Sequence, residues 1–327
     1  MKTTKMLAVL LSLLVSSILI QLPELNFAEE KYPTKAIKFI VPYAAGSKTD
    51  VICRKVVSIA KESLGQEIIV ESKEGAAGLV AARFLAKSKP DGYTMGALPS
   101  SPFAISPNFA KIDLDPLTDV VPIIQIITNN QVLAVPFNSP IKTLKEFIEA
   151  GHKRQITASS PGLSSTEVAL RRLAAETKIN LKIVPFGGSG PSIMAALGGQ
   201  VDAYAGGGVY EYVRAGKMRV IVRFTEEARK PFQDVPSLKD LGYNISAIGF
   251  VGLFGPKGLP AQIHKKLEEG LTRGARDPST TEVIDSLGET FFFRNSEDLG
   301  NYLREVYEQS GKEFKELGLG LYAKDKK

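Results

Sequence analysis

Three short loops carry the residue types that could bind an anion. They are Tyr43–Asp50, Ser159–Thr166 and Phe186–Ser192, each rich in glycine, serine or threonine. Each loop follows an apolar run that predicts a strand and precedes a stretch that predicts a helix. Such a loop places unpaired backbone N–H groups and the positive end of a helix dipole beside its hydroxyl groups, which suits a carboxylate or phosphate. The three loops together indicate a ligand cleft lined by helix ends.

The residues that catalysis would need are scarce. The chain has two histidines, His152 and His264, in charged or polar stretches, where they predict solvated helix or turn positions. A GxSxG elbow and a helical pair of histidines four residues apart are both absent, so a catalytic triad and a metal site have no support. The run Gly187–Ser192 lacks the GxGxxG spacing and no Walker sequence occurs, so nucleotide binding is not indicated. The sequence predicts neither an enzyme nor a cofactor or metal.

The elements that must position these loops alternate between short apolar runs and amphipathic stretches. Ile37–Val41 predicts a strand, and Thr49 or Asp50 is the expected cap of a helix that ends near Leu64 before Gly65. Further strands are expected at 67–71, 93–98, 132–135, 155–158, 181–185, 201–204, 220–223 and 248–254, with helices to about 87 and at 144–150, 166–176, 192–197, 261–276 and 296–317. Repeated strand, glycine-rich loop and helix predict a parallel α/β sheet.

Length and composition indicate how many lobes the chain has and which partners it can bind. The chain has 327 residues, 44% hydrophobic and 23% charged, with a net charge of +6 spread along the sequence. This length predicts two lobes, and the absence of a visible internal repeat or linker suggests that strands crossing between the lobes join them. The basic residues form no patch, so nucleic acid is excluded as a partner. The single cysteine, Cys53, has apolar neighbours at helical spacing, which predicts a buried inert thiol.

The N-terminus predicts export. Lys2 and Lys5 precede the apolar run 6–20, and Ala28 is a small residue before a charged stretch. This is the pattern of a secretory signal peptide over residues 1–28, and an uncleaved anchor is the alternative. We therefore expect the mature protein in the periplasm.

A resemblance to a known family rests on motifs spread from Tyr32 to about Gly318. They are Tyr32-Pro33-Thr34-Lys35-Ala36-Ile37, Ile40-Val41-Pro42-Tyr43-Ala44-Ala45-Gly46 with Asp50, Leu64-Gly65-Gln66, Val70-Glu71, Gly75-Ala76-Ala77-Gly78, Pro90-Asp91-Gly92-Tyr93-Thr94, Val184-Pro185-Phe186, Gly190-Pro191, Leu197-Gly198-Gly199-Gln200-Val201-Asp202, Val235-Pro236-Ser237-Leu238 and Leu241-Gly242-Tyr243. In this order the sequence resembles the substrate-binding subunits of tripartite tricarboxylate transporters, also called Bug receptors.

The resemblance implies a type II periplasmic-binding-protein fold, with two α/β lobes, a two-strand hinge and a ligand closed between the lobes. It implies a first lobe at 32–128 plus 247–327 and a second at 129–246. It also implies that main-chain N–H groups and small hydroxyls hold the ligand's carboxylate. The implied ligand-binding residues are Tyr43, Ala45, Gly46, Ser47, Ser164, Ser165, Thr166, Gly188 and Ser189, with Ser100 and Ser101 as further candidates.

The implied function is an extracytoplasmic receptor that captures a small organic acid and delivers it, as a monomer, to the membrane permease subunits of a tripartite transporter. Ser47, Lys48 and Val168 depart from the residues common in the family, so tricarboxylates, dicarboxylates, aromatic acids and amino acids all stay open as ligands. Two alternatives also stay open. One is a sensor subunit that docks to a signalling receptor, and the other is a periplasmic enzyme on the same scaffold.

Overall fold

The computed structural model describes residues 32–162, 164–225 and 231–323, so the predicted signal peptide 1–28 lies outside the described residues. A six-stranded sheet has the order β11-β4-β10-β3-β1-β2. Its strands are β1 (Ile37–Val41), β2 (Ile68–Ser72), β3 (Thr94–Pro99), β4 (Val120–Thr128), β10 (Phe250–Pro256) and β11 (Thr290–Arg294). β1 pairs in parallel with β2 and β3, as predicted, but β10 and β11 run antiparallel to their neighbours. The predicted parallel pairing therefore holds for β1 to β3, and the sheet as a whole is mixed.

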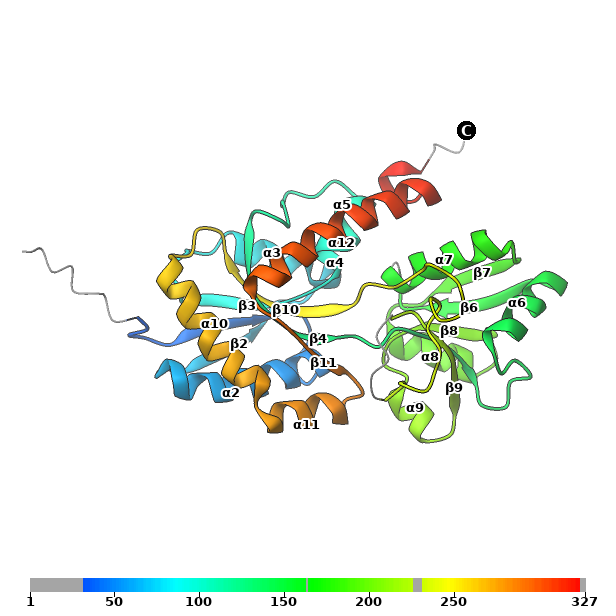
Figure 1. Cartoon of the computed structure of the whole chain (residues 1–327), viewed down its shortest axis with the longest axis horizontal. Helices are drawn as coiled ribbons and strands as arrows, with labels where there is room; N and C mark the ends of the chain where they lie inside the picture. Colours follow the sequence, from blue (N-terminus) through cyan, green and yellow to red (C-terminus); the bar gives the residue numbers. More distant parts are fainter. Residues whose placement is uncertain (1–31, 163, 226–230, 324–327) are drawn as a thin grey trace, which may run out of the picture. The chain divides into compact units, whose positions relative to one another are not determined.

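Helices cover both faces of this sheet (Figure 1). On one side lie α2 (Lys48–Leu64), α10 (Ala261–Arg276) and α11 (Pro278–Ser286), and on the other lie α3 (Leu79–Ala86), α4 (Ser101–Ala104) and α12 (Ser296–Leu317). This part of the chain also contains three short helices, η1 (Ala76–Gly78), α5 (Ser106–Phe109) and η2 (Gly320–Tyr322). α10 approaches α2 closely at Gly274, where a Cβ atom would lie 2.2 Å from the Val56 carbonyl oxygen. Glycine at this position is what allows the two helices to touch.

α2 carries the first predicted loop into the fold. Its buried side chains recur at helical spacing, among them Ile52, Val56 and Ala60, so one face packs into the core. Cys53 lies on this face and is fully buried, as predicted, and burial raises the pKa of its thiol. The helix ends at Gly65 as predicted, but its cap is Ser47 and not Thr49 or Asp50, because Ser47 precedes the first helical residue.

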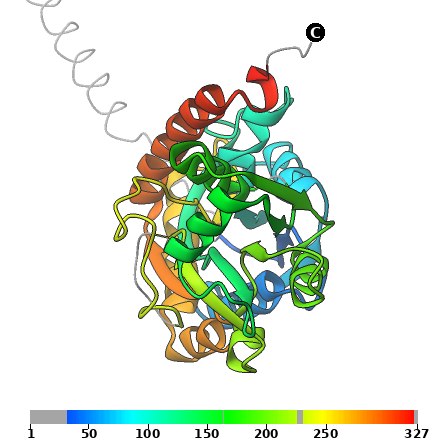
Figure 2. The ribbon, with the colours of Figure 1, turned by 90° about the vertical axis from the view of Figure 1, so that its right-hand side faces the viewer.

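A five-stranded sheet has the order β7-β6-β8-β5-β9. Its side of the molecule faces the viewer in Figure 2. The sheet consists of β5 (Val132–Pro136), β6 (Ile156–Ser160), β7 (Leu181–Pro185), β8 (Ala203–Gly206) and β9 (Met218–Arg223), with helices α6 (Leu144–Lys153), α7 (Ser165–Thr177), α8 (Ser189–Leu197) and α9 (Tyr210–Arg214). Along β5, Leu133 and Val135 join one core with α6 and α7, whereas Val132 and Ala134 join another with α8 and α9. This period of two shows that both faces of the sheet are covered.

Two segments connect the sheets. Residues 129–131 lead from β4 to β5, and the chain returns from β9 to β10 by way of residues 224–249. The segments are hydrogen-bonded to each other, with the Asn129 N–H 2.9 Å from the Gly249 oxygen and the Phe224 N–H 2.8 Å from the Gln131 oxygen. They form the two-strand hinge. The exact residues at which each lobe begins and ends stay a prediction. None of the described helices is long and apolar enough to span a membrane.

Candidate functional site

The first loop is held by bonds among its own residues. The Gly46 N–H donates to the Asp50 carboxylate at 2.9 Å, and the Ser47 N–H donates to the Ala44 oxygen at 3.0 Å. Gly46 takes a φ of +82°, which L-residues rarely adopt. Arg54 binds the same carboxylate at 2.9 Å. Burial acts to raise the pKa of Asp50, but the hydrogen bonds from Arg54 and Gly46 outweigh it, so that pKa lies below its usual value.

A cavity of about 380 Å³ opens beside this loop. Its lining contains two of the predicted ligand residues, Tyr43 and Ser47, together with Pro42, Ala44, Glu74, Gly75, Ala77 and Gly78. Burial raises the pKa of Tyr43 to about 12, so its phenol stays protonated at neutral pH. The predicted residues Ala45 and Gly46 are exposed nearby. The cavity thus combines a mostly apolar wall with polar residues at Tyr43, Ser47 and Glu74.

Lys48 does not project freely from the loop. Its ammonium donates to the Leu287 carbonyl oxygen at 2.6 Å and lies 3.5 Å from the Glu289 carboxylate. Glu289 is buried and also accepts a bond from Asn129 at 3.3 Å. Burial raises the pKa of Glu289, more than Lys48 and Asn129 lower it. The charge that departs from the family pattern is therefore paired within the protein.

The second set of predicted residues surrounds the start of α7. Ser164 caps the helix, and its hydroxyl accepts the Glu167 N–H at 3.3 Å. Ser165 donates its hydroxyl proton to the Ile248 carbonyl oxygen at 2.6 Å, and Thr166 donates to the Gln131 side chain at 2.6 Å. Both acceptors belong to the segments that connect the sheets. These hydroxyl groups therefore bond to the hinge in this structure.

Ser100 reaches the same hinge carbonyl from the other sheet. It follows β3, is buried, and donates to the Ile248 oxygen at 3.1 Å. One backbone oxygen thus receives the hydroxyls of Ser100 and Ser165, which are predicted ligand residues of different lobes. Ser101 is the first residue of α4, next to this contact.

The third predicted loop leads into α8. The helix begins at Ser189, three residues earlier than predicted, because Pro191 fits within its first turn. Gly188 is the cap residue and supplies no capping side chain. Burial raises the pKa of Tyr204 to about 12, and the Ser189 side chain, hydrogen-bonded to it, opposes this shift. The Tyr204 hydroxyl also donates to the Gly207 oxygen at 2.6 Å, so Ser189 lies beside the glycines that follow β8.

Three contributors to this region were not predicted from the sequence. Gln131 and Ile248 receive the hydroxyls described above, and the run Gly206–Gly208 lies beside α8. Gln131 did leave a signal, since it is a polar residue directly before the apolar strand β5. Ile248 acts through its backbone oxygen, so its side chain could not have revealed it.

The two histidines lie apart from these loops. His152 is exposed near the end of α6, as predicted. His264 is partly buried, and its Nε2 lies 2.8 Å from the Pro122 oxygen, so the prediction of a solvated position is wrong for this residue. Over residues 32–162, 164–225 and 231–323, no cluster of side chains could hold a metal ion.

Comparisons with known proteins identify the family of this chain. The model of the tripartite tricarboxylate transporter family receptor, TctC, matches residues 52–319. A UPF0065 protein encoded in the gbd 5' region of Cupriavidus necator is 31% identical over 294 residues, which cover 89% of this chain and 90% of the relative.

Two solved structures show the same fold. A ligand-free TctC solute-binding protein from Polaromonas is 25% identical, with a TM-score of 0.76 over 87% of this chain and 99% of that one. MatC from Rhodopseudomonas palustris, with bound malate, is also 25% identical, with a TM-score of 0.71 over 86% of this chain and 99% of that one. The chain therefore belongs to the tripartite tricarboxylate transporter receptor family and is a solute-binding receptor with the fold of that family.

Proposed function

We propose that this receptor binds a small carboxylate-bearing solute between the first loop and the starts of α7 and α8. The observation that carries the proposal is the convergence of Ser100 and Ser165 on the Ile248 carbonyl oxygen. A hydroxyl group has one proton to donate. Each serine can therefore donate either to the hinge or to a carboxylate, and ligand binding would free the hinge to move.

Backbone donors support the same ligand class. The first N–H groups of α2, α7 and α8 have no partners within their helices, and the helix dipoles favour negative charge there. α8 begins without a capping side chain, which leaves its donors open to a ligand. MatC, a structural relative with bound malate, also supports a carboxylate ligand.

The residues around the proposed site favour ligand binding without catalysis. Two charged residues of the first loop are paired within the protein, Asp50 with Arg54 and Lys48 with Glu289. Neither histidine lies among the proposed ligand residues. We therefore expect the ligand to be held and released unchanged.

Family membership supports the rest of the proposal. We infer that the receptor acts as a monomer in the periplasm after export by residues 1–28, and that it delivers its ligand to the membrane permease subunits of a tripartite transporter. Closure about the hinge segments would enclose the ligand before delivery.

Titration calorimetry and thermal unfolding with a panel of organic acids test the proposal, using the mature chain. A ligand at about a hundred times its Kd should stabilise the fold by about 2.7 kcal/mol. Gly46→Ala is the diagnostic variant because no protein atom lies within 4 Å of the added Cβ, which would face the approaching ligand. Gly65→Ala is the matched control, since Gly65 also has a positive φ of +71° and open space at the other end of α2.

Both glycine variants should lose about 1 kcal/mol of stability from backbone strain. Only Gly46→Ala should weaken binding of the acid, by about tenfold or more. The proposal fails if no acid in the panel binds to protein shown to be ligand-free by native mass spectrometry. The proposed location fails if both variants retain the wild-type Kd.

A further inference from the structure

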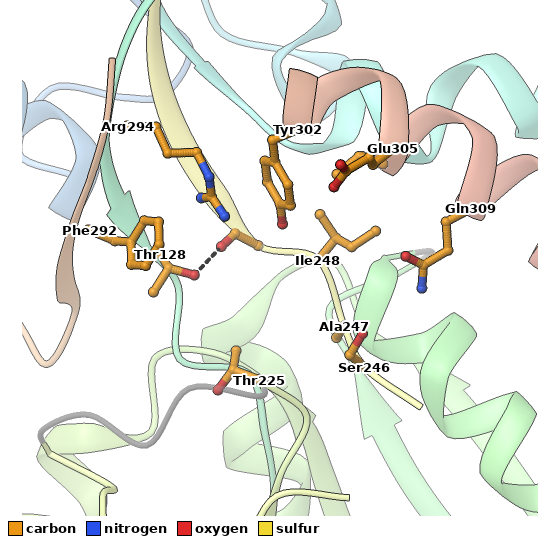
Figure 3. A pocket seen from close by; sticks show the side chains of 12 residues that line it. Thr128, Thr225, Ser246, Ala247, Ile248, Phe292, Arg294, Tyr302, Glu305 and Gln309 are labelled. Atoms are coloured by element: carbon orange, nitrogen blue, oxygen red, sulfur yellow. Dashed lines mark hydrogen bonds between the residues drawn. The ribbon is translucent and has the colours of Figure 1, made fainter. Parts of the chain in front are cut away.

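A second cavity, of about 290 Å³, lies against the hinge (Figure 3). The residues that line it are Thr128, Thr225, Ser246, Ala247, Ile248, Gly249, Phe292, Arg294, Tyr302, Glu305, Val306 and Gln309. We call it the hinge pocket. None of the residues proposed above to hold the carboxylate lines it, so it is a separate site.

Its walls come from elements attached to both sheets. Thr225 follows β9, and Ser246 to Gly249 form the returning hinge segment. Phe292 and Arg294 lie on β11, Thr128 ends β4, and the remaining side chains project from α12. A molecule in the hinge pocket would therefore contact both parts of the receptor and the connection between them.

A positioned cation forms one wall. The Arg294 guanidinium lies 4.3 Å from the Phe292 ring and 3.9 Å from the Tyr302 ring, and it donates to the Gln125 side chain at 2.7 Å. These contacts fix the plane of the guanidinium. Across the described ranges no carboxylate lies within salt-bridge distance of Arg294, and most of its N–H donors are unused.

A carboxylate and an unsatisfied hydroxyl complete the polar lining. Glu305 is exposed on α12 and forms no ion pair with any residue that the structure describes. Thr225 is only 8% exposed, and its hydroxyl has no hydrogen-bond partner among the residues that the structure describes. A buried hydroxyl without a partner is unfavourable, so a ligand that bonded to it would be stabilised. Figure 3 shows Arg294, Glu305 and Thr225 around the same space.

We propose that the hinge pocket binds a small zwitterion of the amino-acid class. The lining contributes one positive and one negative charge that are not paired with each other. A carboxylate would face Arg294, an ammonium group would face Glu305, and Thr225 would bond to either group. A simple anion would pair with Arg294 but be repelled by Glu305. A simple cation would pair with Glu305 but be repelled by Arg294.

Titration calorimetry on the mature chain tests this with a panel of neutral L-amino acids and two matched fragments. Propionate is alanine without its ammonium group, and ethylamine is alanine without its carboxylate. At least one amino acid should bind in the millimolar range or tighter, and both fragments should bind at least about tenfold more weakly.

Variants locate the binding. Glu305→Gln should weaken amino-acid binding by about tenfold, whereas Glu308→Gln, on an exposed neighbour that does not line the pocket, should not change it. Thr225→Val should weaken binding without lowering the melting temperature of the free protein, because it removes an unsatisfied hydroxyl. Gly46→Ala should leave amino-acid binding intact, which separates the hinge pocket from the proposed carboxylate site.

The proposal is overturned if no amino acid binds, if the fragments bind as tightly as the amino acid, or if Glu305→Gln and Glu308→Gln have equal effects. Loss of amino-acid binding in Gly46→Ala would assign the amino acid to the first site instead, and the hinge-pocket proposal would then be wrong. Failure of the organic-acid panel would leave this result untouched.

Discussion

The starts of α2 and α7 have the same local arrangement of residues. The sequence Ser-Lys-Thr-Asp-Val-Ile-Cys-Arg opens α2 from Ser47, and Ser-Ser-Thr-Glu-Val-Ala-Leu-Arg opens α7 from Ser164. In each, the serine hydroxyl caps the helix by accepting the N–H of the acidic residue at 3.3 Å. In each, that acidic side chain is buried and pairs with the arginine one turn later. The two sheets thus present the same type of helix start.

The difference lies in what the remaining groups contact. Asp50 accepts the Gly46 N–H within its own loop, whereas Glu167 accepts the Ser160 hydroxyl from the end of β6. The first residue of α2, Lys48, bonds to the Leu287–Glu289 turn, and the first residue of α7, Ser165, bonds to the hinge. The α2 start is therefore fixed to its own lobe, and the α7 start is tied to the segment that must bend.

The largest expected loss of stability comes from changing the acidic residue at each helix start. Asp50→Asn removes the charge that binds Arg54 and disturbs the acceptor of the Gly46 N–H, and should cost about 2 kcal/mol. Glu167→Gln keeps an acceptor for Ser160 and should cost about 1 kcal/mol. Urea unfolding at neutral pH measures both. Equal losses would show that the two helix starts are held alike, against the distinction drawn here.

The pH dependence sharpens this test. Because the folded-state pKa of Asp50 is below its unfolded value, its contribution is complete above about pH 4 and is lost as the pH falls through the folded-state pKa. The stability difference between wild type and Asp50→Asn should therefore shrink only below about pH 4.

The next effect concerns the cation that only the first loop has. Lys48→Ala leaves Glu289 buried without its ammonium partner and should cost about 1 kcal/mol at neutral pH. The pKa of Glu289 is already raised by burial, so its ionised form destabilises the fold at neutral pH, and this cost is relieved as the pH falls through the folded-state pKa. The deficit of Lys48→Ala should thus begin to shrink above pH 4, unlike that of Asp50→Asn. Adding Glu289→Gln should restore stability, and a double variant less stable than Lys48→Ala would contradict this.

Much of the fold could be read from local patterns. The strands at 37–41 and 181–185 and the helices at 261–276 and 296–317 lie where the apolar spacing predicted them. β4, α9, α11 and β11 were not among the predicted elements. β11 has three consecutive phenylalanines, Phe291 to Phe293, all only partly buried, so no alternation marks it as a strand.

The site was harder to predict, because its contacts are distant in sequence. The three loops followed from residue types alone, and the resemblance supplied Ser100 and Ser165. Their shared acceptor, Ile248, lies 148 and 83 residues away, and no local pattern encodes such a contact. The correspondence between the α2 and α7 starts spans only eight residues, which is too short to be recognised as a repeat without the structure.

The smallest single-variant effects test the hinge contact itself. Ser100→Ala and Ser165→Ala each leave one hydroxyl on the Ile248 oxygen, so each should cost only about 0.5 kcal/mol of stability. The double variant leaves that buried oxygen without either hydroxyl and should cost about 2 kcal/mol, more than the sum of the single losses. A double-mutant cycle by urea unfolding measures this coupling, with Ser58→Ala on the exposed face of α2 as the control partner, which should be additive with either serine. Additive losses for Ser100 and Ser165 would mean that the two serines do not share an acceptor in solution. The tie between the two lobes would then have to lie elsewhere, with the Thr166–Gln131 bond as the next contact to remove.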